Sequence, residues 1–573
     1  MLTLGGLALA TVAVAAYPLG LDNNPVMGPR RIALLALGLG AILFAQASPI
    51  RKWLGISSPL RQAPAAIGQG FQMEASAAPP RAMGPGLWLS LSLVSLAIMG
   101  LYAYLVTGGD PAALPTTTLY YDMLAEAFAS GQANLKAVPD PRLADLSNPY
   151  DPAEHGQIPR CQQGQTSDCL LFDVTYYDGK YYLYWGPAPA ALLAPLKLAG
   201  IGTVGDSTLA FVGAAFLFAF TAAFFVLAWR RFFRPLPSWL LIPPLVLAGL
   251  AYPLPWVLDG PRIYEAAILH GAAFLMAGLV AAFPILSGGR ASPGRLVLVG
   301  ILWGLAFATR SVLLFPIVAC SAVLVWLVWR RREDSNLGSG GWLVARLAIP
   351  IVASVALIAS YNFARFSNPL EFGWRYTLGA PAGQAEGTLA AFRLANIPVN
   401  LYNYAFAPAS MIGEAPYLRP ILAGRSIGPI AIPHPDFFYG ELVTGLVFTT
   451  PFLLFAVSLL WTLSCSSIPG SRDITATEGL GFGQGTNLRP IVACILLGCL
   501  AGLIPLLSLY AVTARYLLDV SPLLIVLAGL GAWAAYAGAT TRTSRALVGL
   551  AIVGTAVVSV VASILLAFNN WLR

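Results

Sequence analysis

Long apolar stretches separated by short polar turns dominate the pattern of hydrophobic and polar positions along the chain. A helix needs about 20 apolar residues to cross the hydrocarbon core of a membrane, because each residue adds about 1.5 Å along its axis. The pattern predicts an all-α polytopic membrane protein with about thirteen transmembrane helices. The predicted spans are residues 2–19, 32–47, 87–107, 207–229, 239–258, 264–286, 296–310, 311–329, 342–361, 441–464, 490–510, 517–538 and 547–568.

The composition excludes the soluble classes of protein. The chain has 573 residues, of which 57% are hydrophobic and 10% are charged, whereas about 25% of a soluble chain is charged. This rules out a soluble enzyme, a nucleic-acid-binding protein and a disordered scaffold. The 2–19 stretch lacks a basic start and is followed by a second apolar stretch, so we interpret it as a span rather than a signal peptide.

Clusters of basic residues predict the orientation in the membrane. Arg and Lys accumulate in cytoplasmic loops, and all the clusters fall on one side if residues 187–201 do not cross. We therefore expect the N-terminus in the cytoplasm and the C-terminus outside. Only four of the 33 basic residues are Lys, which is typical of a GC-rich bacterial genome, so we expect a bacterial inner (plasma) membrane protein. The clustered residues are Arg51, Lys52, Arg61, Arg81, Arg230, Arg231, Arg234, Arg290, Arg295, Arg330, Arg331, Arg332, Arg542 and Arg545.

Two long segments, 108–186 and 362–440, remain on the outside. Loops of this length are usually functional or disordered, and their many aromatic residues argue against disorder. Residues 48–86, rich in Ala, Pro, Gly and Gln, are predicted to form a flexible cytoplasmic linker. The predicted organisation is two extra spans and the linker in 1–86, a transmembrane core in 87–361, a second external loop in 362–440 and C-terminal helices in 441–573.

Two acidic residues stand in the first external segment. Asp122 and Glu126 are four residues apart within an apolar pattern of helical spacing, so they share one face of a short helix just outside the membrane. A carboxylate there can accept a proton from an acceptor hydroxyl or bind a divalent metal ion. The simpler interpretation is a pair of solvated carboxylates on an exposed helix face.

A dense aromatic cluster ends the same segment, in FDVTYYDGKYYLYWGPAP. It is either an aromatic belt at the membrane interface or a surface that stacks on a sugar or a lipid headgroup. Asp173, Asp178 and Lys180 supply polar groups nearby, and YDGK predicts a tight turn in which Gly179 has a positive φ. The cluster comprises Tyr176, Tyr177, Tyr181, Tyr182, Tyr184 and Trp185.

Two arginines stand at the predicted outer ends of spans. Arg310 lies between two apolar segments with no local partner, and Arg515 precedes Asp519 by four residues. Arginine binds phosphate well, and ionisable groups at membrane depth are functional candidates. We expect both arginines to face a shared, outward-opening cavity; the alternative for Arg515 is an ion pair with Asp519 that fixes a helix end.

The cysteines and histidines add one structural prediction. Cys161 and Cys169 lie close together within CQQGQTSDC, and two cysteines in an oxidising compartment predict a disulfide. His155 is nearby, but the spacing does not match a zinc site. We interpret His270 as a hydrogen-bonded intramembrane residue and His434 as a candidate for lining the external cavity.

Four segments of the chain stand out: YYDMLAEAFASGQ from Tyr120, GLAFATRSVLLF from Gly304, YNFARFSNPLEFGWRYTLG from Tyr361 and ARYLLDVSPLLIVLAG from Ala514. They resemble the GT-C superfamily of polytopic glycosyltransferases, in particular the bacterial group related to protein mannosyltransferases and aminoarabinose transferases. The resemblance covers roughly residues 87–540. Many members carry an Asp-Glu pair at a position that falls here on Thr116 and Thr117.

The resemblance implies transfer of a sugar from a polyprenyl-phosphate donor to a glycan, lipid or protein acceptor on the outer face. It implies no nucleic-acid partner and leaves a divalent metal ion open. Asp122, with Asp173 as the second choice, is then the catalytic acidic residue, which takes the proton of the acceptor or holds a metal ion. The donor phosphate is assigned to Arg310, Arg515, Arg375 and Lys180, and the acceptor or sugar to Tyr120, Tyr121, Glu126, Tyr182, Trp185 and His434.

Two other functions fit the same sequence. A transporter or flippase of lipid-linked sugars predicts internal repeats and broken helices around charges at the membrane midplane, whereas the charges here gather at span ends. A non-catalytic membrane subunit would keep the fold without the acid pair, as Thr116 and Thr117 suggest.

Overall fold

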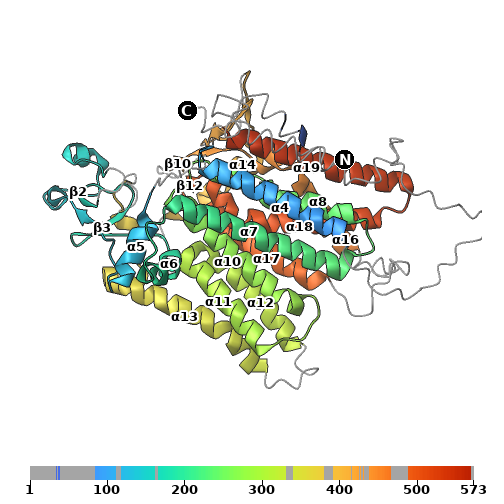
Figure 1. Cartoon of the computed structure of the whole chain (residues 1–573), viewed down its shortest axis with the longest axis horizontal. Coiled ribbons are helices and arrows are strands. Elements are labelled where there is room, and N and C mark those ends of the chain that lie inside the picture. The colour runs from blue at the N-terminus through green and yellow to red at the C-terminus, as the bar shows by residue number, and fades with distance from the viewer. Residues whose placement is uncertain are drawn as a thin grey trace, which may run out of the picture.

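The computed structural model describes residues 34, 37–38, 84–110, 118–161, 166–330, 340–379, 391–413, 416–424, 426–427, 430–431, 438–465 and 488–568. Within this part of the chain, nine helical segments are long and apolar enough to cross a membrane, so the protein is a polytopic helical membrane protein (Figure 1). They are α4 (Pro85–Val106), α7 with its π-helical end (Asp206–Phe233), η4 to α9 (Ser238–Val257), α10 (Ile263–Leu286), η5 with α12 (Ser311–Arg330), α13 (Gly340–Phe366), α17 (Arg489–Ser508), α18 (Ser521–Gly538) and α19 (Arg542–Ala567).

The remaining predicted spans differ in outcome. The span at 2–19 and nearly all of 32–47 lie outside the described residues. The 296–310 span is the shorter helix α11 (Pro293–Thr309). The prediction of one continuous helix over 441–464 is wrong. Pro451 has no backbone N–H to donate, so the helix is interrupted there. That segment contains β11 (Leu442–Val443), α15 (Leu446–Thr449), η11 (Pro451–Leu453) and α16 (Leu454–Cys465).

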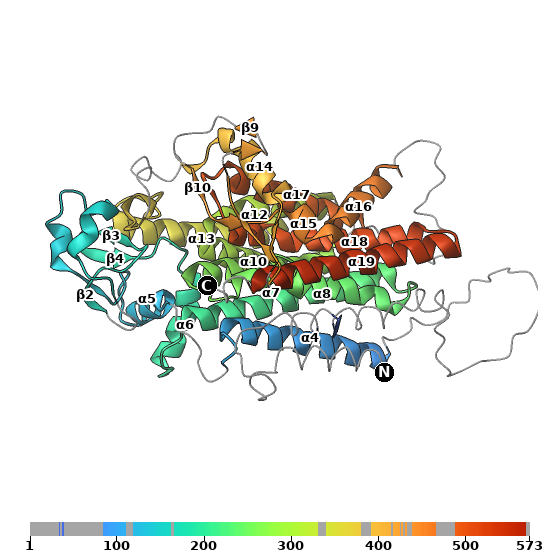
Figure 2. The ribbon, with the colours of Figure 1, turned by 90° about the horizontal axis from the view of Figure 1, so that it is seen from above.

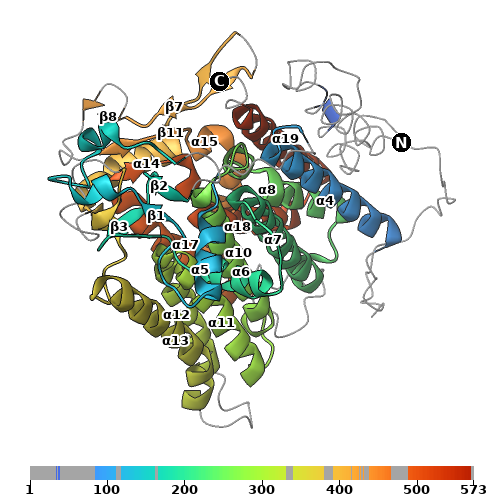
Figure 3. The same ribbon diagram turned by 60° about the vertical axis from the view of Figure 1, so that its left-hand side comes forward.

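The η4–α9 span and α10 are the most enclosed spans of the bundle, and α13 is its edge; the apolar window of η4–α9 is 94% buried. In the apolar window of α10, 83% of the residues are buried inside the protein, against 17% for α13. Figure 3 shows α10 among α7, α11, α17 and α18 (Figure 3). Because α13 has few protein neighbours, most of its apolar surface is left to the lipid.

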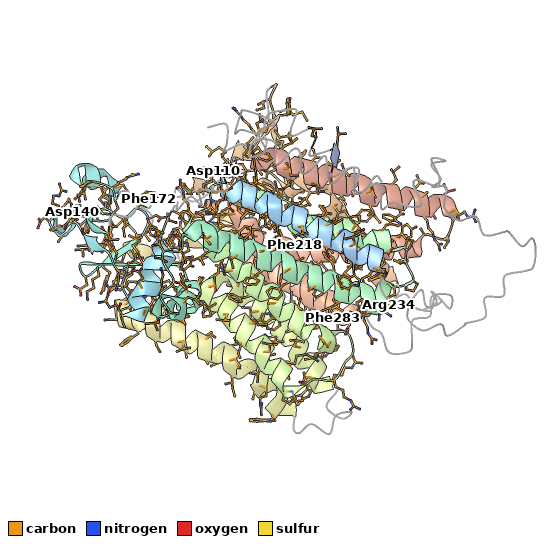
Figure 4. The ribbon with its side chains drawn as sticks, in the orientation of Figure 1. Asp110, Asp140, Phe172, Phe218, Arg234 and Phe283 are labelled. Carbon is orange, nitrogen blue, oxygen red and sulfur yellow. A yellow bond between two sulfur atoms is a disulfide. The ribbon has the colours of Figure 1, made fainter. Side chains whose placement is uncertain are left out.

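The first external segment and the basic turns lie at opposite ends of the bundle. Asp140 and Phe172 are at one end, Arg234 is at the other, and Phe218 and Phe283 lie between them (Figure 4). We call these the loop end and the basic end. The helices alternate in direction between the two ends, as the sequence pattern predicted.

The first external segment folds against the loop end, next to α5 (Tyr120–Ala129) and α6 (Ala188–Leu198) (Figure 2). Eleven residues of α6 are too short to cross, as the orientation argument required. The hairpin of β3 (Thr175–Tyr177) and β4 (Lys180–Tyr182) turns through Asp178 and Gly179, which both have positive φ. This is the YDGK turn that the sequence predicted. Parallel strands β1 (Val138–Pro139) and β2 (Ser167–Cys169) lie beyond it, and the predicted Cys161–Cys169 disulfide is formed.

The second external segment contains α14 (Ile397–Phe406) and short strands. Strand β10 (Tyr439–Gly440) pairs in parallel with β12 (Ala511–Val512), which follows α17. This pair brings Glu441 beside the start of η12 (Ala514–Asp519). The other strands are β5 (Ser410–Met411) with β6 (Leu418–Arg419), β7 (Ile421–Leu422) with β11, and β8 (Ser426–Ile427) with β9 (Ile430–Ala431).

Candidate functional site

A cavity of about 150 Å³ lies at the loop end, where α10, the end of α11 and both external segments meet. Its lining is mainly aromatic, with Arg310 as the charged group. Such a combination of apolar faces and a few polar groups is typical of a ligand site. The aromatic lining comprises Tyr184, Trp185, Tyr264, Phe372, Trp374, Phe392 and Tyr516.

One wall of the cavity is the end of the predicted aromatic cluster. The ring centroids of Tyr184 and Trp185 are 3.9 Å apart, and Trp185 meets Tyr264 edge-on at 5.1 Å. The next residue, Gly186, presses on the last turn of α11: a Cβ there would stand 2.2 Å from the Ala308 carbonyl oxygen. Only glycine allows this approach, so the wall is set against α11 by Gly186.

Arg310 joins the cavity to a helix far along the chain. It follows the last residue of α11 in extended conformation, and its Nε and Nη2 donate to the two carboxylate oxygens of Asp519 at 2.6 and 2.7 Å. Its guanidinium also lies 5.0 Å from the Tyr516 ring centroid. Arg310 therefore has a partner that its own sequence neighbourhood does not show.

Arg515 has different partners from those that the sequence suggested. Its Nη2 donates to Glu441 at 2.7 Å, Glu265 lies 3.9 Å from its Nη1, and its guanidinium stacks 4.6 Å from the Tyr264 centroid. The alternative of an Arg515–Asp519 pair is wrong, because η12 is a 3₁₀ helix, in which residues four apart do not share a face.

The expected shared cavity is only partly present. Arg310 lines it, while Arg515 lies behind Tyr264 and is not among the lining residues of the part of the chain described. Arg515 Nε is buried and has no hydrogen-bond partner among the described residues. Its guanidinium thus retains capacity for a further acceptor.

Asp173, the second choice for the acid, stands directly behind the cavity wall. Its carboxylate accepts a hydrogen bond from Tyr184 at 3.2 Å and another from Tyr264, and both tyrosines line the cavity. Burial raises the pKa of Asp173, although the two tyrosine hydrogen bonds and the charge of Arg515 oppose this shift. The backbone of Asp173 has a positive φ of 57°.

Asp122, the first choice for the acid, lies in a different place. It is 4% exposed, pairs with Lys197 of α6 at 2.5 Å and accepts the backbone N–H of Val204 at 2.8 Å. Glu126 is 3.7 Å from the same lysine and is half exposed. These contacts dock α5 on α6, and neither acid lines the aromatic cavity.

Three tyrosines predicted as site residues contact the segments that form the cavity walls. The hydroxyl of Tyr120 donates to the Phe172 carbonyl at 2.8 Å, and that of Tyr121 donates to the Gly186 carbonyl at 3.2 Å. Tyr182 packs on Phe366, with the ring centroids 5.5 Å apart. These tyrosines hold the segments that carry the site.

Two predicted phosphate ligands lie away from the cavity. Lys180 is exposed on the β3–β4 hairpin, and Arg375 is half exposed with Glu371 at 3.6 Å. His434, Thr116 and Thr117 lie outside the described residues. His270 Nδ1 donates to the Ala266 carbonyl oxygen of its own helix at 2.9 Å.

Sequence reasoning missed several residues of the site. Glu265 and Glu441 each stand at the start of a predicted span, and this position is a signal for a functional carboxylate. No local sequence pattern indicated a functional role for Tyr264 or Trp374. In the part of the chain that the structure covers, no three His, Cys, Asp or Glu residues group as metal ligands.

Comparisons with models of known protein families, with curated proteins and with solved structures found no match for this chain.

Proposed function

We propose that this protein is a glycosyltransferase that moves a sugar from a polyprenyl-phosphate donor to a glycan, lipid or protein acceptor. The observation that carries the proposal is the loop-end cavity, which combines aromatic walls, Arg310 and two tyrosines bound to Asp173. Aromatic faces suit the C–H faces of a sugar ring, and a guanidinium suits a phosphate.

The chemistry follows from these groups. The acceptor hydroxyl attacks the anomeric carbon, the bond between that carbon and the phosphate oxygen breaks, and polyprenyl phosphate leaves. Asp519 holds Nε and Nη2 of Arg310, so the remaining guanidinium nitrogen, Nη1, would stabilise the charge of the leaving phosphate. Asp173 would take the acceptor proton, either directly or by way of the Tyr264 hydroxyl. Asp122 is a less suitable base because Lys197 already holds its carboxylate.

The position in the membrane supports a lipid-linked donor. The cavity lies at the ends of α10 and α11, so a polyprenyl chain beside the bundle can present its headgroup there. The basic turns lie at the other end, which by the positive-inside rule is cytoplasmic. The loop end then faces the periplasm or cell exterior of a bacterial inner membrane.

A transporter or flippase is less well supported. Arg310, Arg515 and Asp173 lie at helix ends or in a loop, whereas transport of a lipid-linked sugar needs polar groups along a path to the other end.

The test is mass spectrometry of surface glycans and glycoproteins in a deletion strain. The strain is complemented with the wild type, with Asp173→Asn, or with Asp178→Asn as a matched control on the exposed hairpin turn. We expect the wild type and Asp178→Asn to restore a missing sugar and Asp173→Asn not to do so. Unchanged glycans in the deletion strain, with the protein normally expressed in the parent, would favour a non-catalytic subunit.

A further inference from the structure

A second cavity lies at the basic end, far from the aromatic site. It has a volume of about 490 Å³ and runs between α12 and α17. Val323, Trp326 and Arg330 line it on α12, and Arg489 and Ala493 line it on α17. Apart from the two arginines, the lining is apolar. We call this cavity the α12–α17 groove.

The groove lies beside a close contact between the two helices. Cys320 Sγ lies 3.4 Å from the Cys494 carbonyl oxygen, and a Cβ on Gly498 would stand 2.7 Å from that sulfur. On the same two turns of α17, the neighbouring residues Ala493 and Leu497 line the groove. The groove therefore runs alongside this contact toward the basic end.

The groove faces the lipid and not the protein interior. The Trp326 side chain is 52% exposed, and Leu497 on the opposite wall is 47% exposed. Both belong to membrane-spanning helices, so their exposed apolar surface meets acyl chains. A cavity of this size and composition is suited to part of an acyl chain.

The mouth of the groove carries positive charge at the depth of the headgroups. Arg330 is the last residue of α12 and Arg489 the first of α17, and both are exposed. The Arg330 guanidinium lies 5.3 Å from the Trp326 ring centroid, which holds it above the apolar floor. Basic pockets between helix ends bind anionic lipid headgroups.

We propose that the α12–α17 groove is a binding site for an anionic phospholipid, with the phosphate on Arg330 and Arg489 and an acyl chain along Trp326 and Ala493. The site is independent of the proposed glycosyl transfer. It would anchor the α12–α17 pair at the leaflet of the basic end.

Native mass spectrometry of the purified full-length protein, titrated with phosphatidylglycerol or with phosphatidylcholine of the same acyl chains, tests this proposal. Each basic residue near an anionic surface contributes about a fivefold factor in affinity. We expect Arg330→Gln and Arg489→Gln each to weaken phosphatidylglycerol binding about fivefold, and the double variant to weaken it about 25-fold. Phosphatidylcholine binding should change little.

Two further variants separate headgroup from chain. Arg290→Gln, an exposed arginine in another turn of the basic end, should leave binding unchanged. Ala493→Phe fills the groove without changing charge and should weaken both lipids, with its thermal unfolding compared to show that it folds. Equal binding of the two lipids by the wild type, or an effect of Arg290→Gln as large as that of Arg330→Gln, would overturn the proposal.

Discussion

The ion pairs of Lys197, Arg310 and Arg515 at the loop end join distant parts of the chain. Arg310 and Asp519 are 209 residues apart, and their bidentate contact is 15% and 7% exposed on the two sides. Removing one partner of such a pair leaves a buried charge without compensation, whereas the intact pair is close to neutral in its effect on stability. The same reasoning decides how Asp122 can be tested.

Replacing Asp122 by Asn should lower stability, because the buried Lys197 loses its nearest carboxylate and keeps only Glu126 at 3.7 Å and the Gly202 carbonyl. We expect a loss in the free energy of unfolding that stays below the roughly 3–5 kcal/mol of a buried charge left without any partner, measured by thermal or denaturant unfolding in detergent. The double variant Asp122→Leu with Lys197→Met should recover most of this loss. If the double variant is stable and active, Asp122 has a structural role; a stable but inactive double variant would return it to the catalytic role.

If the proposed sugar transfer uses Asp173 as its base, the pH dependence of the rate should report the raised pKa of Asp173. Since burial favours its neutral form, the carboxylate becomes a base only at a higher pH than an exposed aspartate would. Tyr264→Phe removes a hydrogen bond to the charged form, so the acidic limb of the rate profile should move to still higher pH. Tyr150→Phe, which removes a loop hydroxyl bound to the Tyr176 carbonyl, is the control and should leave the limb in place.

The raised pKa of Asp173 also makes the folding stability of the protein depend on pH. A carboxyl whose folded pKa is raised contributes stability that is fully present below the unfolded pKa of an aspartate and is lost as pH rises through the folded pKa. Asp173→Asn should therefore reduce the loss of stability in that range, even where it abolishes transfer.

At the scale of elements, the external segment is fastened to the bundle at a few points. The carboxylate of Asp206, at the start of α7, accepts from the Thr118 hydroxyl and from the backbone N–H groups of Tyr120 and Tyr121. It thus satisfies free donors at the first turn of α5 from another helix. This contact, with the Asp122–Lys197 pair, fixes α5 and α6 beneath the cavity.

The disulfide should brace the outer part of this segment without supporting the bundle. Replacing Cys161 and Cys169 by Ser removes a short closed loop, worth roughly 2–3 kcal/mol in the chain-entropy model. We expect faster hydrogen exchange in residues 138–161 and 166–170, with α10 and α18 unchanged. Reductant should reproduce the effect in the wild type and have none in the variant; faster exchange in α10 and α18 after reduction would contradict this.

At the scale of the whole molecule, the two ends of the bundle should lie on opposite sides of the membrane. Asp145 is exposed in the loop-end segment and Arg290 in a turn of the basic end. We expect Asp145→Cys to react with a membrane-impermeant thiol reagent in intact cells and Arg290→Cys to react only after permeabilisation. The reverse result would invert the orientation, and labelling of both positions from one side would contradict the arrangement of the helices.

The amino-acid sequence by itself determined the features that depend on neighbouring residues. The long apolar runs predicted the membrane helices, because crossing a bilayer requires about 20 consecutive apolar residues whatever the fold. The YDGK turn and the Cys161–Cys169 pair follow from contacts over a few residues. Pro451 itself favours an interruption of the helix, but the apolar run around it led to the prediction of one continuous span over 441–464.

The tertiary structure alone decided which polar groups meet. Asp519 pairs with Arg310 and not with its near neighbour Arg515, because the 3₁₀ geometry of η12 turns the two side chains apart and helix packing brings α11 within reach. Long-range packing likewise places Asp173, rather than Asp122, behind the cavity wall. Local patterns contain no information on such contacts, since they depend on how distant helices pack around α10.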